Sequence, residues 1–242
     1  MVFDIRWHCR QGNRTADNRD HIGIGVRGDA VMIIVLDGST AGLSSGYFAR
    51  AVARHMVDWF VSAAQNVNAD RLEAQLRATH DTLAGDFRKD SASYALLYVE
   101  AAKPAVVLHA GDCLVGRRGV DGRATWLMQP HTLANALRAV PIEILANEPA
   151  RHRVTRSFRS RQFMAPDRNS FALDDQTLLV ATDGFWAELD SARQNAFVEG
   201  RLSASSGDRD DCGVLLISRT GHELTTKVAG VHSAGSIYLR GV

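Results

Sequence analysis

The segment Leu178–Leu189 reads LLVATDGFWAEL, an apolar run that stops at Thr182-Asp183-Gly184. We interpret Gln176–Ala181 as a strand and Phe185–Leu189 as a short helix, so Asp183 stands where the strand ends. Other acidic residues lie beside apolar, strand-like runs in the same way: Asp20, Asp37, Asp112 and Asp210-Asp211. Because strand ends are rigid, we expect these carboxylates to converge at one edge of a sheet.

Converging carboxylates indicate a site for divalent cations. Like charges held close together raise one another's pKa values, and bound cations remove that penalty. Oxygen ligands favour Mg²⁺ or Mn²⁺ over zinc, and the sequence has neither an HExxH motif nor a CxxC pair. Two such ions about 3.5–4 Å apart suit hydrolysis of a phosphate ester. Taken singly, each Asp-Gly or Gly-Asp pair is more typical of an ordinary turn, so the evidence for a site is their order along the chain.

The rest of the pattern predicts hairpin strands, then two helices, then further strands. The predicted strands are His21–Arg27, Val31–Leu36, Ser91–Glu100, Ala105–Ala110 and Gly213–Ser218, with Ser236–Arg240 as an edge strand or a partner contact. Apolar residues at helical spacing predict helices from Phe48 to Ala63 and from Leu72 to Phe87, the second capped by Asn68 or Asp70. Because the hairpins precede the helices, an α+β fold with antiparallel sheets is expected.

Composition narrows the class of protein. Of the 242 residues, 45% are hydrophobic, which favours a globular protein. The 28 Lys and Arg nearly balance the 27 Asp and Glu, so the net charge gives no indication that the protein binds nucleic acid or a membrane. No segment approaches the roughly 20 apolar residues of a membrane span, and the N-terminus lacks a signal-peptide pattern. Three unpaired-looking cysteines fit a reducing compartment. We expect a cytoplasmic protein with one domain, 1–242, and a loop-rich, flap-like insertion at about 130–167.

A series of short motifs follows in order between Arg14 and Ser218. They are Arg14 with Asn18-Arg19-Asp20, VLDGST (Val35–Thr40), HAGDCLVGRRG (His109–Gly119), Pro130-His131-Thr132, VTRSF (Val154–Phe158), LLVATDGFWAEL (Leu178–Leu189) and DRDDCGVLLIS (Asp208–Ser218). In this order the sequence resembles the metal-dependent type 2C serine/threonine protein phosphatases. The resemblance implies a four-layer α-β-β-α sandwich, in which helices flank two antiparallel sheets.

The resemblance also implies a role for each matching residue. The metal ligands would be the carboxylates of Asp20, Asp37, Asp183 and Asp210 and the backbone carbonyl of Gly38, with Asp112 and Asp183 holding a third, weaker ion. Two divalent cations, Mn²⁺ or Mg²⁺, would activate the water that hydrolyses phosphoserine or phosphothreonine in a protein. Arg14 would hold the substrate phosphate, which its planar guanidinium fits. The natural partner would be a phosphorylated protein, a cognate kinase or that kinase's target.

Some positions depart from the family pattern. Arg19 replaces the glutamate before Asp20, a charge reversal for which Asp17 is a candidate compensation. Ser39 and Thr40-Ala41 replace the His or Met and the Gly-Gly of the second motif. These changes make a catalytically weak or inactive pseudophosphatase that binds phosphoproteins the alternative. A metal-dependent hydrolase of a small phosphorylated metabolite is a third hypothesis.

Two questions about arginines stay open. One extra residue separates Arg14 from the first aspartate motif, so Arg6 and Arg10 are alternative phosphate ligands. The stretch Arg151–Arg161 (RHRVTRSFRSR) carries five arginines and no acid. It either grips a phosphorylated or acidic partner or places alternate arginines on the exposed face of a strand, and we favour the strand. Outside these arginines, the two histidines His109 and His131 are expected to have structural roles.

Overall fold

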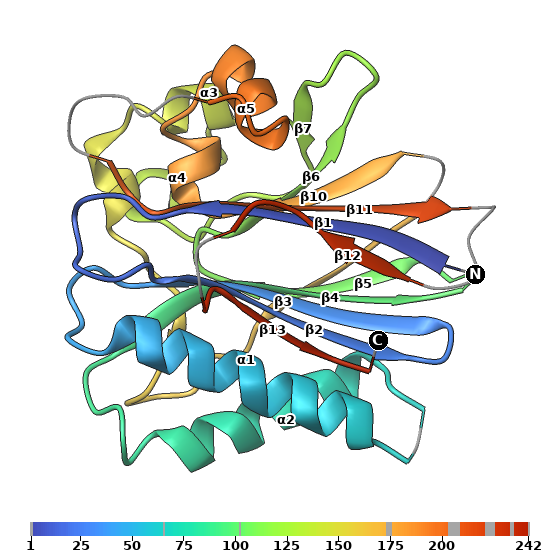
Figure 1. Ribbon diagram of the computed structural model, residues 1–242. Coiled ribbons are helices and arrows are strands. Elements are labelled where there is room, and N and C mark those ends of the chain that lie inside the picture. The colour runs from blue at the N-terminus through green and yellow to red at the C-terminus, as the bar shows by residue number, and fades with distance from the viewer. Residues whose placement is uncertain are drawn as a thin grey trace.

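The computed structural model describes residues 2–64, 66–101, 103–172, 176–202, 209–220, 226–232 and 235–241. Two β-sheets lie face to face in this part of the chain, and helices cover both outer faces (Figure 1). The first sheet has the order β12 (Lys227–Ala229), β1 (Val2–Arg10), β11 (Cys212–Thr220), β10 (Thr177–Ala181), β6 (Leu114–Arg118) and β7 (Ala124–Trp126). The second has the order β13 (Ile237–Arg240), β2 (Asp20–Arg27), β3 (Ala30–Gly38), β4 (Ser91–Glu100), β5 (Ala105–Ala110) and β9 (Asp167–Phe171), and β8 (Phe158–Arg159) pairs with β4.

The helices form the two outer layers. The second sheet is covered by α1 (Ser45–Ser62) and α2 (Ala69–Leu83), and the first by α3 (Ile142–Leu145), α4 (Asp183–Trp186) and α5 (Ser191–Val198) (Figure 1). This arrangement confirms the predicted α-β-β-α sandwich. Strand pairs are antiparallel except at one edge of each sheet, where β12 runs parallel to β1 and β13 parallel to β2. The predicted edge strand near the C-terminus is therefore present, as β13.

The apolar run Val31–Leu36 is continuous because both faces of β3 are buried. Its odd-numbered residues pack between the two sheets, and its even-numbered residues pack against the helices. A strand covered on both faces has no solvent-facing position, so a polar alternation is absent. The same burial on both faces extends along β4.

The long helix α1 lies close over β2 because β2 carries glycines where larger side chains would collide. A Cβ atom placed on Gly25 would lie 2.7 Å from the Phe60 ring, well inside van der Waals contact. Of the two predicted caps of the neighbouring helix α2, Asn68 is the one observed: its side chain accepts a hydrogen bond from the Arg71 N–H at 3.0 Å.

The segment between β7 and β9 contains only short elements. They are the 3₁₀ turns η1 (Leu133–Asn135) and η2 (Pro149–His152), the one-turn helix α3 and the two-residue strand β8. A bridge from Thr132 to Val154 joins two parts of this segment, and the His131 N–H holds it to the body of the protein by donating to Gly111 O at 2.8 Å. Within the described residues, no helix combines the length and apolar character needed to cross a membrane.

Candidate active site

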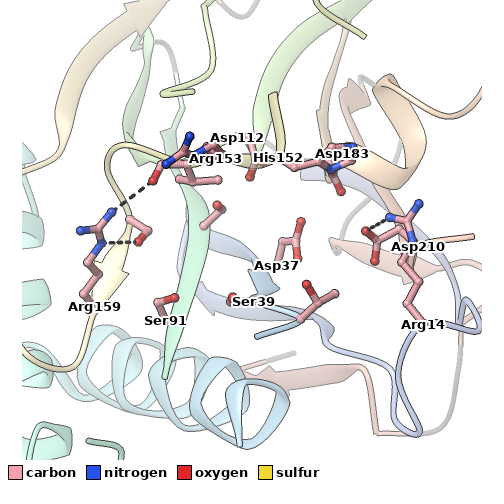
Figure 2. Close-up of a pocket in the computed structure, with 14 residues that line it drawn as sticks. Arg14, Asp37, Ser39, Ser91, Asp112, His152, Arg153, Arg159, Asp183 and Asp210 are labelled. Carbon is pink, nitrogen blue, oxygen red and sulfur yellow. Dashed lines mark hydrogen bonds and ion pairs between the residues drawn. The ribbon is translucent and has the colours of Figure 1, made fainter. Parts of the chain in front are cut away.

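A pocket of about 490 Å³ opens at the end of the sandwich where several strands stop. Figure 2 shows Asp37 near its centre, with Arg14 and Asp210 on one side and Arg159 and Ser91 on the other. The acidic lining residues are Asp37, Asp112, Asp183 and Asp210, and the lining arginines are Arg14, Arg153 and Arg159. Four of the strand-end carboxylates predicted to converge therefore lie around one cavity, and Asp20 and Asp211 are not among its lining residues.

Asp20 and Asp37 face each other as a cross-strand pair of β2 and β3. Asp20 is fully buried beneath the pocket and does not line it: its Oδ2 accepts a hydrogen bond from Thr182 Oγ1 at 2.8 Å. Its Oδ1 has no hydrogen-bond partner among the described residues. Burial, and then the negative charge of Asp211, raises the pKa of Asp20 well above its usual range. Burial and the charge of Asp20 do the same to the pKa of Asp37.

Asp112 and Asp183 lie just beyond the ends of β5 and β10. Asp112 follows Gly111, whose φ of +113° turns the chain where a Cβ atom would lie 2.2 Å from Ser93 Oγ. Burial, followed by the charge of Asp183, raises the pKa of Asp112 to about 7. Asp183 is the first residue of α4 and only 6% exposed. The two carboxyl groups therefore share a buried region that disfavours two negative charges.

Asp210, just before β11, belongs to a network of ion pairs. The Arg14 guanidinium pairs with Asp210 and, at 2.8 Å, with Glu188, while the Asp210 N–H donates to Glu188 Oε2 at 3.1 Å. Burial and the charge of Asp183 raise the pKa of Asp210, and Arg14 partly offsets them. Glu188 was not singled out from the sequence, although it lies in the LLVATDGFWAEL segment five residues after Asp183.

The arginine-rich stretch Arg151–Arg161 does not form the strand we favoured. Only Phe158 and Arg159 are in a strand, and Arg151 lies in η2. Arg151 is 6% exposed and donates to Asp183 Oδ2 at 2.8 Å. Arg153 and Arg159 line the pocket. The prediction of an exposed face was wrong, because the 3₁₀ turn breaks the alternation and the acidic pocket supplies counter-charge for a buried guanidinium.

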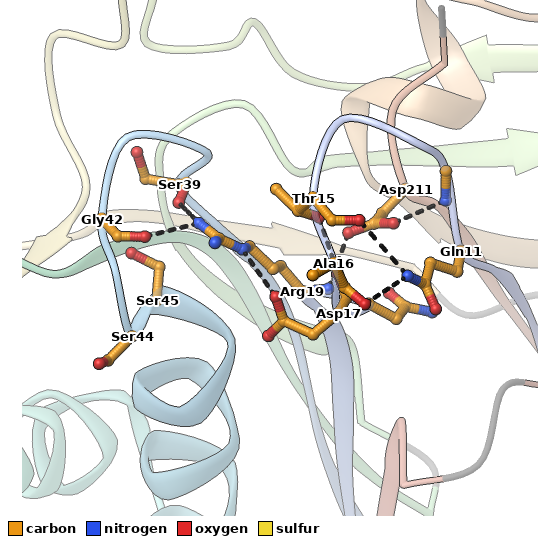
Figure 3. Close-up of polar contacts among 12 residues, drawn as sticks. Gln11, Thr15, Ala16, Asp17, Arg19, Ser39, Gly42, Ser44, Ser45 and Asp211 are labelled. Atoms are coloured by element: carbon orange, nitrogen blue, oxygen red, sulfur yellow. Dashed lines mark hydrogen bonds and ion pairs between the residues drawn. The ribbon is translucent and has the colours of Figure 1, made fainter.

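Arg19, which replaces a glutamate of the phosphatase pattern, has its guanidinium bound by the loop after β3 and by Asp17. Its Nη1 donates to Ser39 O at 2.6 Å and to Gly42 O at 2.7 Å, and its Nε lies 3.3 Å from Asp17 Oδ1 (Figure 3). The predicted compensation by Asp17 is thus present as an ion pair. The Arg19 backbone carbonyl accepts the Gly38 N–H at 3.1 Å, which fixes the strand end that carries Asp37.

A second group of polar side chains lies at the edge of the second sheet, where β5 pairs with β9. His109 and His131 stack with their ring centroids 4.6 Å apart, and His131 Nε2 lies 3.0 Å from Asp167 Oδ2. The Gly111 N–H donates to His131 Nδ1 at 3.1 Å. Within the part of the chain described, these three residues are the one group whose candidate ligand atoms all lie within 4.8 Å of one another. The contacts agree with the expected structural role of His131, which supports the turn before Asp112.

No protein-family model matches the sequence, and neither does any curated protein. Solved structures do match. A serine/threonine phosphatase, Stp1, from Staphylococcus aureus superimposes with a TM-score of 0.75 at 14% identity over 91% of this chain and 96% of its own. The fold is that of the bacterial serine/threonine phosphatases.

Two further matches bear on the site. The PPM Ser-Thr phosphatase MsPP from Mycobacterium smegmatis, solved with cacodylate, has a TM-score of 0.71 at 20% identity, covering 90% of this chain and 99% of that one. The catalytic domain of the phosphatase PstP, solved with two manganese ions, has a TM-score of 0.66 at 16% identity, covering 90% and 98%. Identities this low establish the shared fold, so the activity has to be argued from the site.

Proposed function

We propose that this protein is a metal-dependent phosphatase that hydrolyses phosphoserine and phosphothreonine in proteins, opposing a kinase in the cytoplasm. The observation that carries the proposal is the group of buried and half-buried strand-end carboxylates around one pocket, of which Asp37, Asp112 and Asp210 have pKa values raised by burial and by neighbouring carboxylates. A fold that keeps several acids in one buried place needs positive charge there. Divalent cations provide it, and the PstP structure with the same fold holds two manganese ions.

The residues present fit such ions. The proposed ligands are the carboxylates of Asp20, Asp37, Asp183 and Asp210 and the carbonyl of Gly38, with Asp112 joining Asp183 at a third ion. All are oxygen donors, which is the set that Mg²⁺ and Mn²⁺ prefer. The buried Oδ1 of Asp20, without a partner among the described residues, is an acceptor that a cation or its water can satisfy. Bound divalent ions would neutralise the acids, polarise the phosphoryl group and make water a better nucleophile.

The chain's own side chains would then bind and orient the substrate. Arg14 lines the pocket, and its pairs with Asp210 and Glu188 hold the guanidinium at the acidic end, where it would grip the substrate phosphate. Arg6, the alternative we considered, instead pairs with Asp4 at 2.8 Å and is not a lining residue. Arg10 lines a different pocket. These placements support Arg14 as the phosphate ligand.

The substitution of Arg19 bears on the alternative of an inactive pseudophosphatase. One acidic ligand of the family pattern is absent, yet the arginine that replaces it is fully engaged by Asp17 and two loop carbonyls. It therefore places no unpaired positive charge among the proposed ligands. Since the remaining carboxylates keep their strand-end positions, we favour an active enzyme.

The decisive experiment measures hydrolysis of an aryl phosphate and of a phosphothreonine peptide with Mn²⁺, with Mg²⁺ and after chelation. Asp37→Asn and Asp183→Asn should abolish turnover and weaken Mn²⁺ binding, which electron paramagnetic resonance follows through the loss of the free-ion signal. Asp29→Asn is the matched control, since Asp29 is exposed in the turn at the opposite end of β3. Folded protein that binds Mn²⁺ and phosphopeptide but shows no turnover would establish the pseudophosphatase instead.

A further inference from the structure

We propose that the wall of the pocket formed by Arg153 and Arg159 is an anion subsite, which binds a second negative group of the substrate beside the phosphorylated residue. The inference rests on the proposed function and adds a substrate class to it: phosphoproteins with a carboxylate or a second phosphate close to the phosphorylated side chain. Neither arginine of this wall is one of the proposed metal ligands.

The pocket is divided by charge. Asp183, Asp210 and Arg14 lie at one end, and Arg159 lies at the other end beside Ser91 (Figure 2). The arginine at the acidic end is neutralised by acids: Arg14 pairs with Asp210 and Glu188. Among the residues that the structure describes, no carboxylate lines the opposite wall next to Arg159 to do the same.

Arg159 is held in place without being neutralised. Its Nε donates to Ser157 Oγ and its Nη2 donates to Val154 O, both at 3.2 Å. Both acceptors are uncharged, and the residues described provide no ion pair for this guanidinium. A half-buried arginine fixed by neutral oxygens keeps its full positive charge and its free N–H groups for a ligand.

Arg153 adds a second positive charge from a fixed backbone position. Its carbonyl accepts the Leu133 N–H at 2.9 Å, and its own N–H donates to Ala150 O at 3.2 Å. Its side chain is exposed, lines the pocket, and makes no hydrogen bond or ion pair with any residue that the structure describes. His152, also exposed, lines the same wall. Two guanidinium groups that lack acidic partners make this wall attractive to an anion.

The size of the pocket leaves room for such a group. At about 490 Å³ it falls within the roughly 300–1,000 Å³ of ordinary ligand pockets. The phosphate would lie between Asp37 and Arg14, so the arginine wall remains for a neighbouring side chain. Guanidinium groups bind carboxylates and phosphates through the same fork of N–H groups. The second anion can therefore be an Asp or Glu side chain or another phosphorylated residue.

The test uses phosphothreonine peptides that carry Gln, Glu or phosphoserine at one flanking position, with four such positions examined in turn. Binding is measured by fluorescence anisotropy with non-hydrolysable phosphonate versions, and kcat/KM with the phosphate versions and Mn²⁺. Wild-type protein should prefer Glu over Gln by about threefold and phosphoserine over Gln by about tenfold at one position at least. In the double variant Arg153→Ala/Arg159→Ala, the ratio between the charged peptide and the Gln peptide should fall to about one.

Matched variants separate charge from structure. Arg161→Ala should keep the preference, because Arg161 is exposed, donates to Arg88 O and does not line the pocket. Arg153→Lys/Arg159→Lys should retain part of it. If the double alanine variant is unstable, Arg153→Ala alone suffices, since that side chain is exposed.

An equal preference in wild type and in the alanine variants, or no preference at any position, would overturn the subsite. A preference in binding without any turnover in wild-type protein would support the subsite and refute the phosphatase activity. Hydrolysis whose rate does not depend on the flanking charge would support the phosphatase activity and refute the subsite.

Discussion

Replacing Arg151 by methionine tests whether this side chain competes with divalent cations for Asp183. Arg151 donates to Asp183 Oδ2 at 2.8 Å, and the two side chains are only 7% and 9% exposed. Removing one partner of a buried ion pair costs about 3–5 kcal/mol, because the other charge stays buried and uncompensated. In chelated protein we therefore expect Arg151→Met to lower the free energy of unfolding by about that amount.

Saturating Mn²⁺ should remove most of the loss, since bound cations would supply the charge that Arg151 gives. Binding to the folded state alone adds stability by mass action, and the variant should gain more from Mn²⁺ than wild type does. Urea unfolding in chelator and in Mn²⁺ measures both quantities, with Arg161→Met as the control for an exposed arginine. An equal deficit under the two conditions would refute the competition and leave Arg151 as a permanent partner of Asp183.

Other measurements probe single groups around the same pocket. The pKa of Asp112 is raised to about 7 in the folded protein. The stability that the folded state gains from protonated Asp112 is therefore fully present below the pKa of about 3.9 in the unfolded chain, and it is lost as pH rises through about 7. Urea titrations of chelated protein should show stability falling by up to about 4 kcal/mol over that range, and a flat profile would contradict the raised pKa. Arg14→Lys keeps the charge but not the planar fork, so KM for a phosphopeptide should rise about tenfold in steady-state assays; an unchanged KM would place the phosphate elsewhere. Gly111→Ala should cost more than about 1 kcal/mol in thermal or urea unfolding, because φ is +113° and the new Cβ would meet Ser93. Gly85→Ala, with open space around its Cβ, is the control.

The interior strands are predictable from sequence because their signal is local. β4 and β5 have the bounds expected for Ser91–Glu100 and Ala105–Ala110, since burial on both faces makes most of their residues apolar. β1 was not predicted, although its inward side chains, Phe3, Ile5, Trp7 and Cys9, are buried and alternate with polar ones. That short alternation is also typical of a surface segment, and only pairing with β11, some two hundred residues later, makes it a central strand.

The aspartates of the candidate site also have a local sequence signal, because each stands at the end of an apolar run. Nothing local marks Glu188 or Arg151. Glu188 matters through Arg14, which approaches it from the loop between β1 and β2, and Arg151 matters through Asp183. Such pairs exist only after the sheets have brought distant segments together, so the sequence predicts the acids and leaves their counter-charges unassigned.

The counter-charges in turn bear on the proposed binding of divalent cations. Four acids around one cavity would repel one another strongly if nothing balanced them. Arg14 and Arg151 supply part of that balance from within the chain, through Asp210 and Asp183. The fold can then keep its acidic pocket without cations, and a cation held by Asp183 or Asp210, as we propose, would have to displace the guanidinium paired with that carboxylate. On the proposed function, metal affinity and the stability of the metal-free protein would therefore be opposed: a substitution that weakens either arginine contact should strengthen metal binding and destabilise the metal-free fold.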